Sequence, residues 1–191
     1  ALSFIEHLKT HPLHETRVGH DVVVIGAGNT AIDAATQAKR LGASRVAIVY
    51  RRGERDMPAY DYEYELAKAD GCEFRFYTAP TRILGDTRVT GIECVRTEPA
   101  PDASGQSTLR EVPGSTHVIQ CDLVLKALGQ TARDEFAAAA GLAVENGRLV
   151  SRNPNVFVGG DCANGGAEIV NAAAEGKEAA RKIDRLLRGE G

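Results

Sequence analysis

Residues 21–33 read Asp-Val-Val-Val-Ile-Gly-Ala-Gly-Asn-Thr-Ala-Ile-Asp, and residues 45–52 read Arg-Val-Ala-Ile-Val-Tyr-Arg-Arg. The first segment is a β-branched run that leads into a glycine turn and an alanine-rich helix, and the second is another apolar strand. A strand, a glycine turn, a helix and a second strand within about thirty residues are typical of a dinucleotide-binding βαβ unit. We therefore predict an α/β fold with a Rossmann-like, three-layer dinucleotide-binding domain.

The turn between the first strand and the helix has residues suited to a pyrophosphate. Gly26 permits a tight turn, Gly28 lets the backbone approach the phosphates, and Ala31 allows the helix to pack closely on the strand. We expect the phosphates at the N–H groups that begin the helix, with Asn29 and Thr30 as additional donors. The alternative interpretation is an ordinary strand–turn–helix connection.

Two arginines end the second predicted strand. Arg51 and Arg52 stand where an NAD-binding unit usually carries the acidic residue that binds the ribose 2′-hydroxyl. Guanidinium groups instead offer planar, charge-assisted contacts to a 2′-phosphate. These two residues, which Arg55 could join, favour NADPH over NADH. A solvated basic loop is the alternative interpretation.

Composition and charge exclude several classes of protein. The 191-residue chain has a formal net charge of −3, so it offers no broad basic surface for nucleic acid. No segment has the apolar length of a membrane span, and the first residues lack the basic start and apolar run of a signal peptide. We expect a cytoplasmic protein with neither a membrane nor a nucleic acid as its partner.

Cysteine and histidine spacing gives no redox or metal motif. The four cysteines are Cys72, Cys94, Cys121 and Cys162. The absence of a CxxC pair excludes a local dithiol and any compact iron–sulfur or zinc motif. His7, His11 and His14 have a spacing that could ligate a metal on a helix, but Pro12 interrupts that helix. We expect surface histidines, no metal site and no catalytic acid–base residue.

Apolar periodicity and turn residues predict further elements. They are helices over 2–9 and 57–69, a third parallel strand over 72–78, and the strands of an antiparallel β-meander over 89–97 and 117–125. The stretch 60–65 alternates in polarity and could also be a strand. The alanines that follow it and the stop at Gly71 favour a helix.

A second glycine-containing turn lies near the end of the chain. Residues 156–166 read Val-Phe-Val-Gly-Gly-Asp-Cys-Ala-Asn-Gly-Gly and precede a helix expected from about Glu168. A strand here would deliver Asp161 at its carboxyl end, and Gly160 would leave room for a ligand. The start of the following helix suits the electron-rich edge of a reduced flavin, and Asp161 could hold a ribitol hydroxyl. An ordinary strand-to-helix turn is the alternative.

Together these motifs resemble the two-dinucleotide-binding-domain flavoproteins, the pyridine nucleotide-disulfide oxidoreductase superfamily. Within it the chain is most similar to the branch of the glutamate synthase small subunit and dihydropyrimidine dehydrogenase. The resemblance is carried by residues 23–33, 48–52, 57–59, 95–98, 127–130 and 157–162, and for the branch by 161–166, 170–172 and 175–177. It implies that Gly129, Gly160 and Asp161 also belong to cofactor sites.

The resemblance implies three parts of the chain: an N-terminal helix and linker over 1–18, an NAD(P)H-binding domain over 19–125, and the C-terminal half of a Rossmann-like FAD-binding domain over 126–191. The first FAD half and the iron–sulfur cysteines of the family are missing from this sequence, which implies a fragment of a longer enzyme.

The implied activity passes a hydride from NADPH (or NADH) to FAD and electrons onward. The implied partners are the missing FAD-domain segment and an iron–sulfur or second-flavin domain or subunit. The competing hypothesis is a non-catalytic NADP(H)-binding module that acts as a sensor or scaffold.

Overall fold

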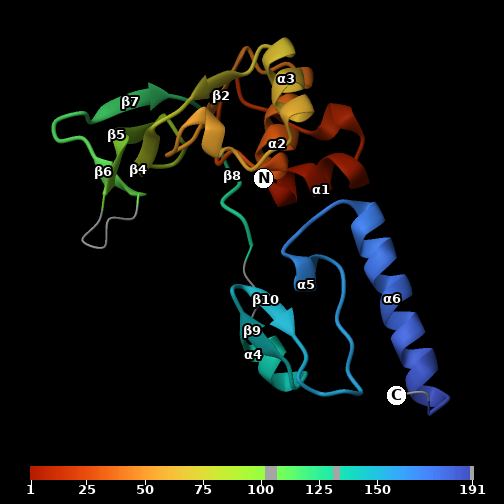
Figure 1. Ribbon diagram of the computed structural model, residues 1–191. Coiled ribbons are helices and arrows are strands. Elements are labelled where there is room, and N and C mark those ends of the chain that lie inside the picture. The colour runs from red at the N-terminus through yellow and green to blue at the C-terminus, as the bar shows by residue number, and fades with distance from the viewer. Residues whose placement is uncertain (102–106, 131–133, 190–191) are drawn as a thin grey trace. The chain divides into compact units, whose positions relative to one another are not determined.

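The computed structural model describes residues 1–101, 107–130 and 134–189 (Figure 1). The chain forms two compact units, residues 1–129 and residues 130–191, here called unit 1 and unit 2. The domain ranges implied by the resemblance, with boundaries after residues 18 and 125, stay predictions. The sequence also predicts a polar connection between the meander strands that contains residues 101–105, and most of these residues lie outside the described ones.

A parallel sheet forms the centre of unit 1. Its strands lie in the order β3-β2-β1-β8. Their bounds are Asp21–Ile25 for β1, Arg45–Val49 for β2, Glu73–Arg75 for β3 and Leu123–Lys126 for β8. β1 pairs in parallel with β2 on one side and with β8 on the other, so Ile25 lies opposite both Val49 and Lys126. The predicted α/β fold with a third parallel strand is confirmed.

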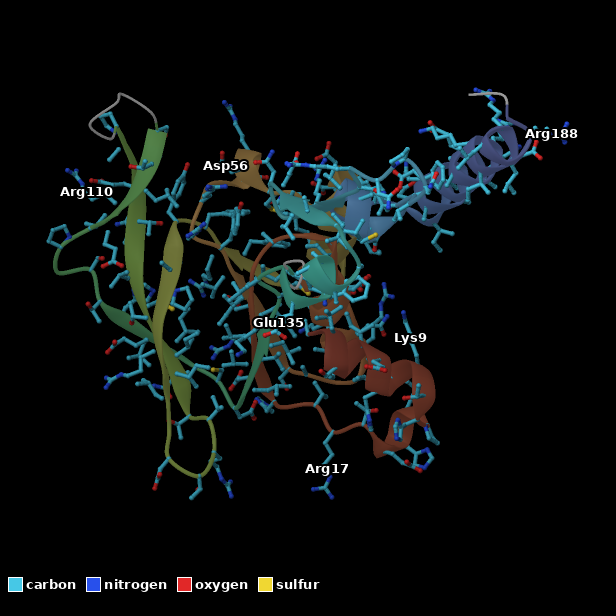
Figure 2. The ribbon with its side chains drawn as sticks, turned by 90° about the horizontal axis from the view of Figure 1, so that it is seen from below. Lys9, Arg17, Asp56, Arg110, Glu135 and Arg188 are labelled. Carbon is cyan, nitrogen blue, oxygen red and sulfur yellow. The ribbon has the colours of Figure 1, made fainter. Side chains whose placement is uncertain are left out.

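An antiparallel sheet packs against one face of the parallel sheet. Its strands are β4 (Thr78–Leu84), β5 (Gly91–Pro101), β6 (Ser107–Glu111) and β7 (His117–Gln120). β5 pairs with the other three, and Arg110 of β6, labelled in Figure 2, forms an ion pair with Glu98 of β5. Alternate strand residues such as Val23 and Ile25 point toward this sheet and share a core with Ile92.

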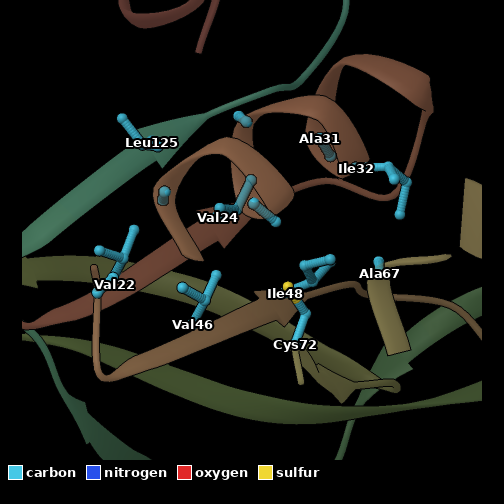
Figure 3. Close-up of a cluster of buried hydrophobic side chains, with 13 residues drawn as sticks. Val22, Val24, Ala31, Ile32, Val46, Ile48, Ala67, Cys72 and Leu125 are labelled. Carbon is cyan, nitrogen blue, oxygen red and sulfur yellow. The ribbon is translucent and has the colours of Figure 1, made fainter. Parts of the chain in front are cut away.

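Three helices cover the other face of the parallel sheet. α2 (Asn29–Arg40) follows the glycine turn, and α1 (Leu2–Thr10) and α3 (Asp61–Ala69) pack beside it. The core between α2 and the sheet, shown in Figure 3, includes Val22, Val24, Val46, Ile48, Leu125, Ala31, Ile32, Ala34, Ala35 and Ala38. Small alanine side chains on one helix face let α2 lie close to the β-branched strands. Unit 1 thus has three layers.

The third parallel strand is shorter than the sequence pattern predicts. The prediction of a strand over 72–78 is wrong beyond Arg75, because Tyr77 adopts a left-handed backbone conformation with φ of +50°. The next residue, Thr78, begins β4 in the antiparallel sheet. The pattern predicts neither β4 nor β6, so the meander has more strands than expected.

The predicted strand over 117–125 is two strands of different sheets. β7 ends at Gln120 in the antiparallel sheet, and β8 begins at Leu123 in the parallel sheet. Between them, the Asp122 carboxylate accepts hydrogen bonds from the N–H groups of His20 and Asp21 at 2.8 and 3.0 Å. These bonds fix the start of β8 beside the start of β1 and so move the chain from one sheet to the other.

The helix predicted over 57–69 begins at Asp61. The preceding segment is extended because its backbone is tied to the glycine turn: the Ala59 N–H donates to Ala27 O at 3.3 Å, and the Tyr60 N–H donates to Asn29 Oδ1 at 3.1 Å. Proline also disfavours a helical conformation in the residue before it. From Asp61 onward, the helical interpretation of the alternating stretch is confirmed.

Unit 2 consists of short elements and one long helix. They are α4 (Asp134–Ala139), β9 (Ala143–Glu145), β10 (Arg148–Val150), α5 (Asp161–Asn164) and α6 (Ile169–Leu187). The prediction of a strand before Gly160 is wrong for the described residues. A strand needs a neighbour for its N–H and C=O groups, and residues 156–159 pair with no described strand. The helix expected from about Glu168 is confirmed.

The described residues contain no disulfide, no cluster of three metal-ligating side chains and no helix long and apolar enough to cross a bilayer. Burial raises the pKa of the Cys72, Cys94 and Cys121 thiols to about 11. The rings of His7 and His11 stack with their centroids 4.0 Å apart. Short 3₁₀ helices lie over Leu13–Glu15 and Glu54–Asp56.

Candidate cofactor-binding sites

The glycine turn lies at the carboxyl edge of the parallel sheet. Gly26 directly follows β1, has a φ of +119°, and donates its N–H to Val49 O at 3.0 Å. A Cβ added at this residue would lie 2.2 Å from Ala127 O, in the segment after β8. Only glycine fits here, because both the backbone conformation and the approach of a second chain segment exclude a side chain.

Gly28 directly precedes α2 and has space beside it. A Cβ at Gly28 would meet only Pro58 Cγ, at 3.6 Å. No side chain caps the helix, and the N–H groups of Asn29 and Thr30 donate to no described residue. Free N–H groups at the positive end of a helix dipole form a suitable site for a phosphate.

The first residues of α2 have different surroundings. Ala31 is 0% exposed and packs in the core, whereas Thr30 is half-buried. The Oδ1 atom of Asn29 accepts the hydrogen bond from the Tyr60 N–H. Its NH₂ group is therefore the part of the amide left to donate to a ligand. Asn29 also has a structural role, since it holds the segment before α3 against the glycine turn.

The arginine pair follows β2 and lies at the same edge of the sheet as the glycine turn. β1 and β2 are parallel, so the segments that follow Ile25 and Val49 emerge side by side. Arg51 and Arg52 are exposed, and neither guanidinium forms an ion pair or hydrogen bond with a described residue. Arg55 is also exposed. This edge therefore carries cationic groups that no described carboxylate neutralises.

A cleft of about 600 Å³ lies next to Arg55 but does not include the glycine turn. It is lined by Glu54, Arg55, Met57, Ala59, Asp61, Tyr64 and Glu65. Burial, together with the hydrogen bond from Tyr64 Oη to Glu54 Oε1 at 2.7 Å, raises the pKa of Tyr64 to about 12. Three carboxylates and one guanidinium make the cleft a poor site for phosphate, which leaves the glycine turn and the arginine pair as the better one.

The remaining predicted site residues fall in two places. Gly129 follows β8 at the same edge of the sheet, with a φ of +86° and nothing within 4 Å of an added Cβ. Unit 1 therefore brings Gly129 to the sheet edge that holds the glycine turn and the arginine pair. Gly160 and Asp161 belong to unit 2.

One carboxylate of α6 holds both ends of α5. Asp161 begins α5 with an exposed side chain, after Gly160 with a φ of +74°. The Gly160 N–H donates to Glu175 Oε2 at 2.5 Å, and Asn164 Nδ2 donates to Glu175 Oε1 at 3.0 Å. Asn164 Oδ1 in turn accepts from the Gly166 N–H at 2.8 Å. The glycine turn of unit 2 is thus fixed to the long helix.

Glu175 and Asn164 are functional candidates to which sequence reasoning gave no role. Both lie in stretches that carry the family resemblance, 175–177 and 161–166. Gly160 and its carboxylate partner are 15 residues apart. A hydrogen bond over that separation leaves no periodic pattern in the sequence. The only sequence signal for Glu175 and Asn164 is therefore the resemblance of their two stretches to the family.

Comparison with known proteins identifies the family. The pyridine nucleotide-disulphide oxidoreductase family matches residues 4–176. The chain belongs to this family. It is 37% identical over 179 residues to the beta subunit of NADP(+)-dependent formate dehydrogenase from Moorella thermoacetica, covering 89% of this chain and 25% of that protein. It is 36% identical over 184 residues to the glutamate synthase [NADPH] small chain of Escherichia coli K12, covering 88% and 39%.

A solved structure shares the fold of this chain. FprA from Mycobacterium tuberculosis in complex with NADPH matches with a TM-score of 0.70 over 98% of this chain and 57% of that chain. At 22% identity, this likeness shows the fold alone. This member of the pyridine nucleotide-disulphide oxidoreductase family spans 25% and 39% of the lengths of the two relatives above. It is related to NAD(P)H-dependent flavoprotein oxidoreductases, as the sequence motifs indicated.

Proposed function

We propose that unit 1 binds NADPH at the carboxyl edge of its parallel sheet. The observation that carries this proposal is the uncapped start of α2 beside Arg51 and Arg52, whose guanidiniums have no described acidic partner. The N–H groups suit the pyrophosphate, and the guanidiniums suit a 2′-phosphate. Both relatives are named for NADP(+) or NADPH, which supports the same cofactor here.

We infer that unit 2 contributes part of an FAD site. The exposed carboxylate of Asp161, fixed through Gly160 and Glu175, suits a ribitol hydroxyl. The Asn171 side chain accepts a hydrogen bond from the Glu168 N–H at 3.2 Å, and the Asn171 N–H donates to Glu168 O at 3.0 Å. The first turn of α6 therefore has one N–H group fewer for a ligand, so Asp161 is the stronger part of the fit.

In the complete protein, the proposed reaction passes a hydride from NADPH to FAD. When bound, FAD would supply a flavin ring that takes up two electrons as hydride and can release them one at a time. The role of this chain is to bind the nucleotide and hold it in position, and positioning alone accounts for much of the rate of such a step. We therefore assign no acid–base side chain to it.

We further propose that the electrons pass to an iron–sulfur or second-flavin centre in a partner domain or subunit. The support is that the relative from Moorella is a beta subunit of a formate dehydrogenase. The chain covers 25% and 39% of the two relatives described above, so we also propose that the adenosine and pyrophosphate half of FAD binds to sequence outside these 191 residues.

The 191-residue chain should bind NADPH but not retain FAD. We assign its Rossmann glycine turn to NADPH, and Asp161 offers too few contacts to offset the entropy of immobilising a large cofactor. After incubation with FAD and desalting, the chain should be colourless in a visible spectrum, while calorimetry detects NADPH. A yellow chain with stoichiometric flavin would contradict this division of the sites.

A longer protein that contains the complete FAD site distinguishes the enzyme hypothesis from the hypothesis of a non-catalytic binding module. With a complete FAD site, it should be yellow, NADPH should bleach it, and Asp161→Ala should weaken flavin retention. A longer protein that binds NADPH without any change in flavin absorbance would instead support a non-catalytic sensor or scaffold.

A further inference from the structure

The segment that carries the arginines, residues 50–56, is here called the arginine turn, and Figure 2 labels its Asp56. Each of its first four carbonyl oxygens accepts a hydrogen bond. The bonds run from the Thr78 N–H to Tyr50 O (3.0 Å), from Thr97 Oγ1 to Arg51 O (2.5 Å), from the Tyr77 N–H to Arg52 O (3.0 Å) and from the Asp56 N–H to Gly53 O (3.1 Å). Three of the four donors belong to the antiparallel sheet or its border, so that sheet holds the turn.

Thr97 is the one donor that uses its side chain. It lies on β5, is 6% exposed, and is 46 residues from the arginine it binds. Its own N–H donates to Tyr77 O at 2.8 Å, so its backbone position is fixed independently of the hydroxyl. Removing the hydroxyl would therefore release the Arg51 carbonyl while every backbone hydrogen bond of the sheet remains.

Tyr77 shows how strongly this region is constrained. Its φ of +50° is unfavourable for a residue with a side chain, and such backbone persists only where the surroundings determine it. It is held between the Thr97 N–H and Arg52 O. A Cβ added at Gly53 would lie 2.3 Å from Tyr77 Oη, so the tyrosine lies directly against the arginine turn.

We propose that Thr97 is a positioning residue for the arginine pair and thereby sets the preference for a 2′-phosphorylated nucleotide. This inference rests on the proposed function, in which Arg51 and Arg52 bind the 2′-phosphate. Two long arginine side chains lose rotamer freedom when they bind one phosphate, and a backbone fixed in advance limits the further loss. Thr97 is buried and acts through the carbonyl of Arg51.

Thr97→Val tests this role, because it removes the hydroxyl at nearly constant volume. In calorimetric titrations of the 191-residue chain, the affinity for NADPH should fall by roughly three- to tenfold and that for NADH should stay unchanged. Thr97→Ser keeps the hydroxyl and should restore the preference. Thr36→Val is the matched control: Thr36 is also buried, at 4% exposed, but its hydroxyl donates to Ile32 O within α2 at 3.0 Å.

The double variant Arg51→Ala/Arg52→Ala separates two kinds of failure. If it keeps the full preference for NADPH, the proposed function is wrong. If it loses the preference while Thr97→Val retains it, only the positioning role is overturned. Equal losses of NADPH and NADH affinity in Thr97→Val would indicate a general structural role and would overturn it as well.

Thr97→Ala is the second variant, which decides the matter should Thr97→Val not fold. It removes the same hydroxyl from Arg51 O and keeps the hydrogen bond from the backbone N–H of residue 97 to Tyr77 O. The preference for NADPH should fall in this variant, with NADH affinity unchanged. An unchanged preference would contradict the proposal.

Discussion

Replacing Gly28 with valine should abolish NADPH binding and leave unit 1 folded. A Cβ at Gly28 would meet only Pro58 Cγ, at 3.6 Å, so the free protein has room for the side chain. The same space is where we place the pyrophosphate. Losing two hydrogen bonds to a charged group costs about 1.5–3 kcal/mol each, so the affinity measured by calorimetry should fall by at least about 100-fold.

Gly26→Ala provides the contrasting variant for this test. Its Cβ would lie 2.2 Å from Ala127 O, at a φ of +119°, so it should lower the melting temperature. Gly28→Val should melt close to the unmodified chain. Normal NADPH affinity in a folded Gly28→Val chain would mean that the phosphates lie elsewhere.

Replacing Arg51 and Arg52 together with alanine should lower NADPH affinity by about ten- to a hundredfold and leave NADH affinity nearly unchanged. The physical reason is the loss of charge-assisted hydrogen bonds to the 2′-phosphate, which contribute about 1.5–3 kcal/mol. Calorimetry at low ionic strength gives the largest effect, because salt screens exposed charges.

A matched control for this variant removes two arginines elsewhere. Arg82 and Arg110 are exposed and pair with Glu93 and Glu98 in the antiparallel sheet. The double variant Arg82→Ala/Arg110→Ala changes the net charge equally and should keep the preference for NADPH. If both double variants lose NADPH affinity equally, the effect is one of net charge and the arginine pair has no specific role.

The βαβ unit could be predicted because its signals are local. β-Branched residues such as Val22 and Val24, the glycines of the turn and the alanines of α2 each favour their own conformation. The path from residue 72 to residue 125 could not be predicted in the same way. The chain changes sheets at Tyr77 and at Asp122, and the second change depends on hydrogen bonds to residues about a hundred positions earlier.

In the candidate site, too, the features with local sequence signals could be predicted and those that depend on distant residues could not. The glycine turn and the arginine pair were found from their residue types and their place after predicted strands. Their supports were not found, because the bonds from Thr97 to Arg51 and from Gly160 to Glu175 join residues 46 and 15 positions apart. The predicted strand before Gly160 fails for a related reason: an apolar run becomes a strand only beside a pairing partner.

The most direct test of NADPH binding by unit 1 is an amide NMR titration of the ¹⁵N-labelled chain with NADPH. We predict that the largest shift changes occur in residues 26–31 and 51–53 and that they saturate together. The amide of Tyr64, which lines the cleft next to Arg55, should change little. If the largest changes occur around Tyr64 or in unit 2 while residues 26–31 and 51–53 stay unchanged, NADPH does not bind where we propose.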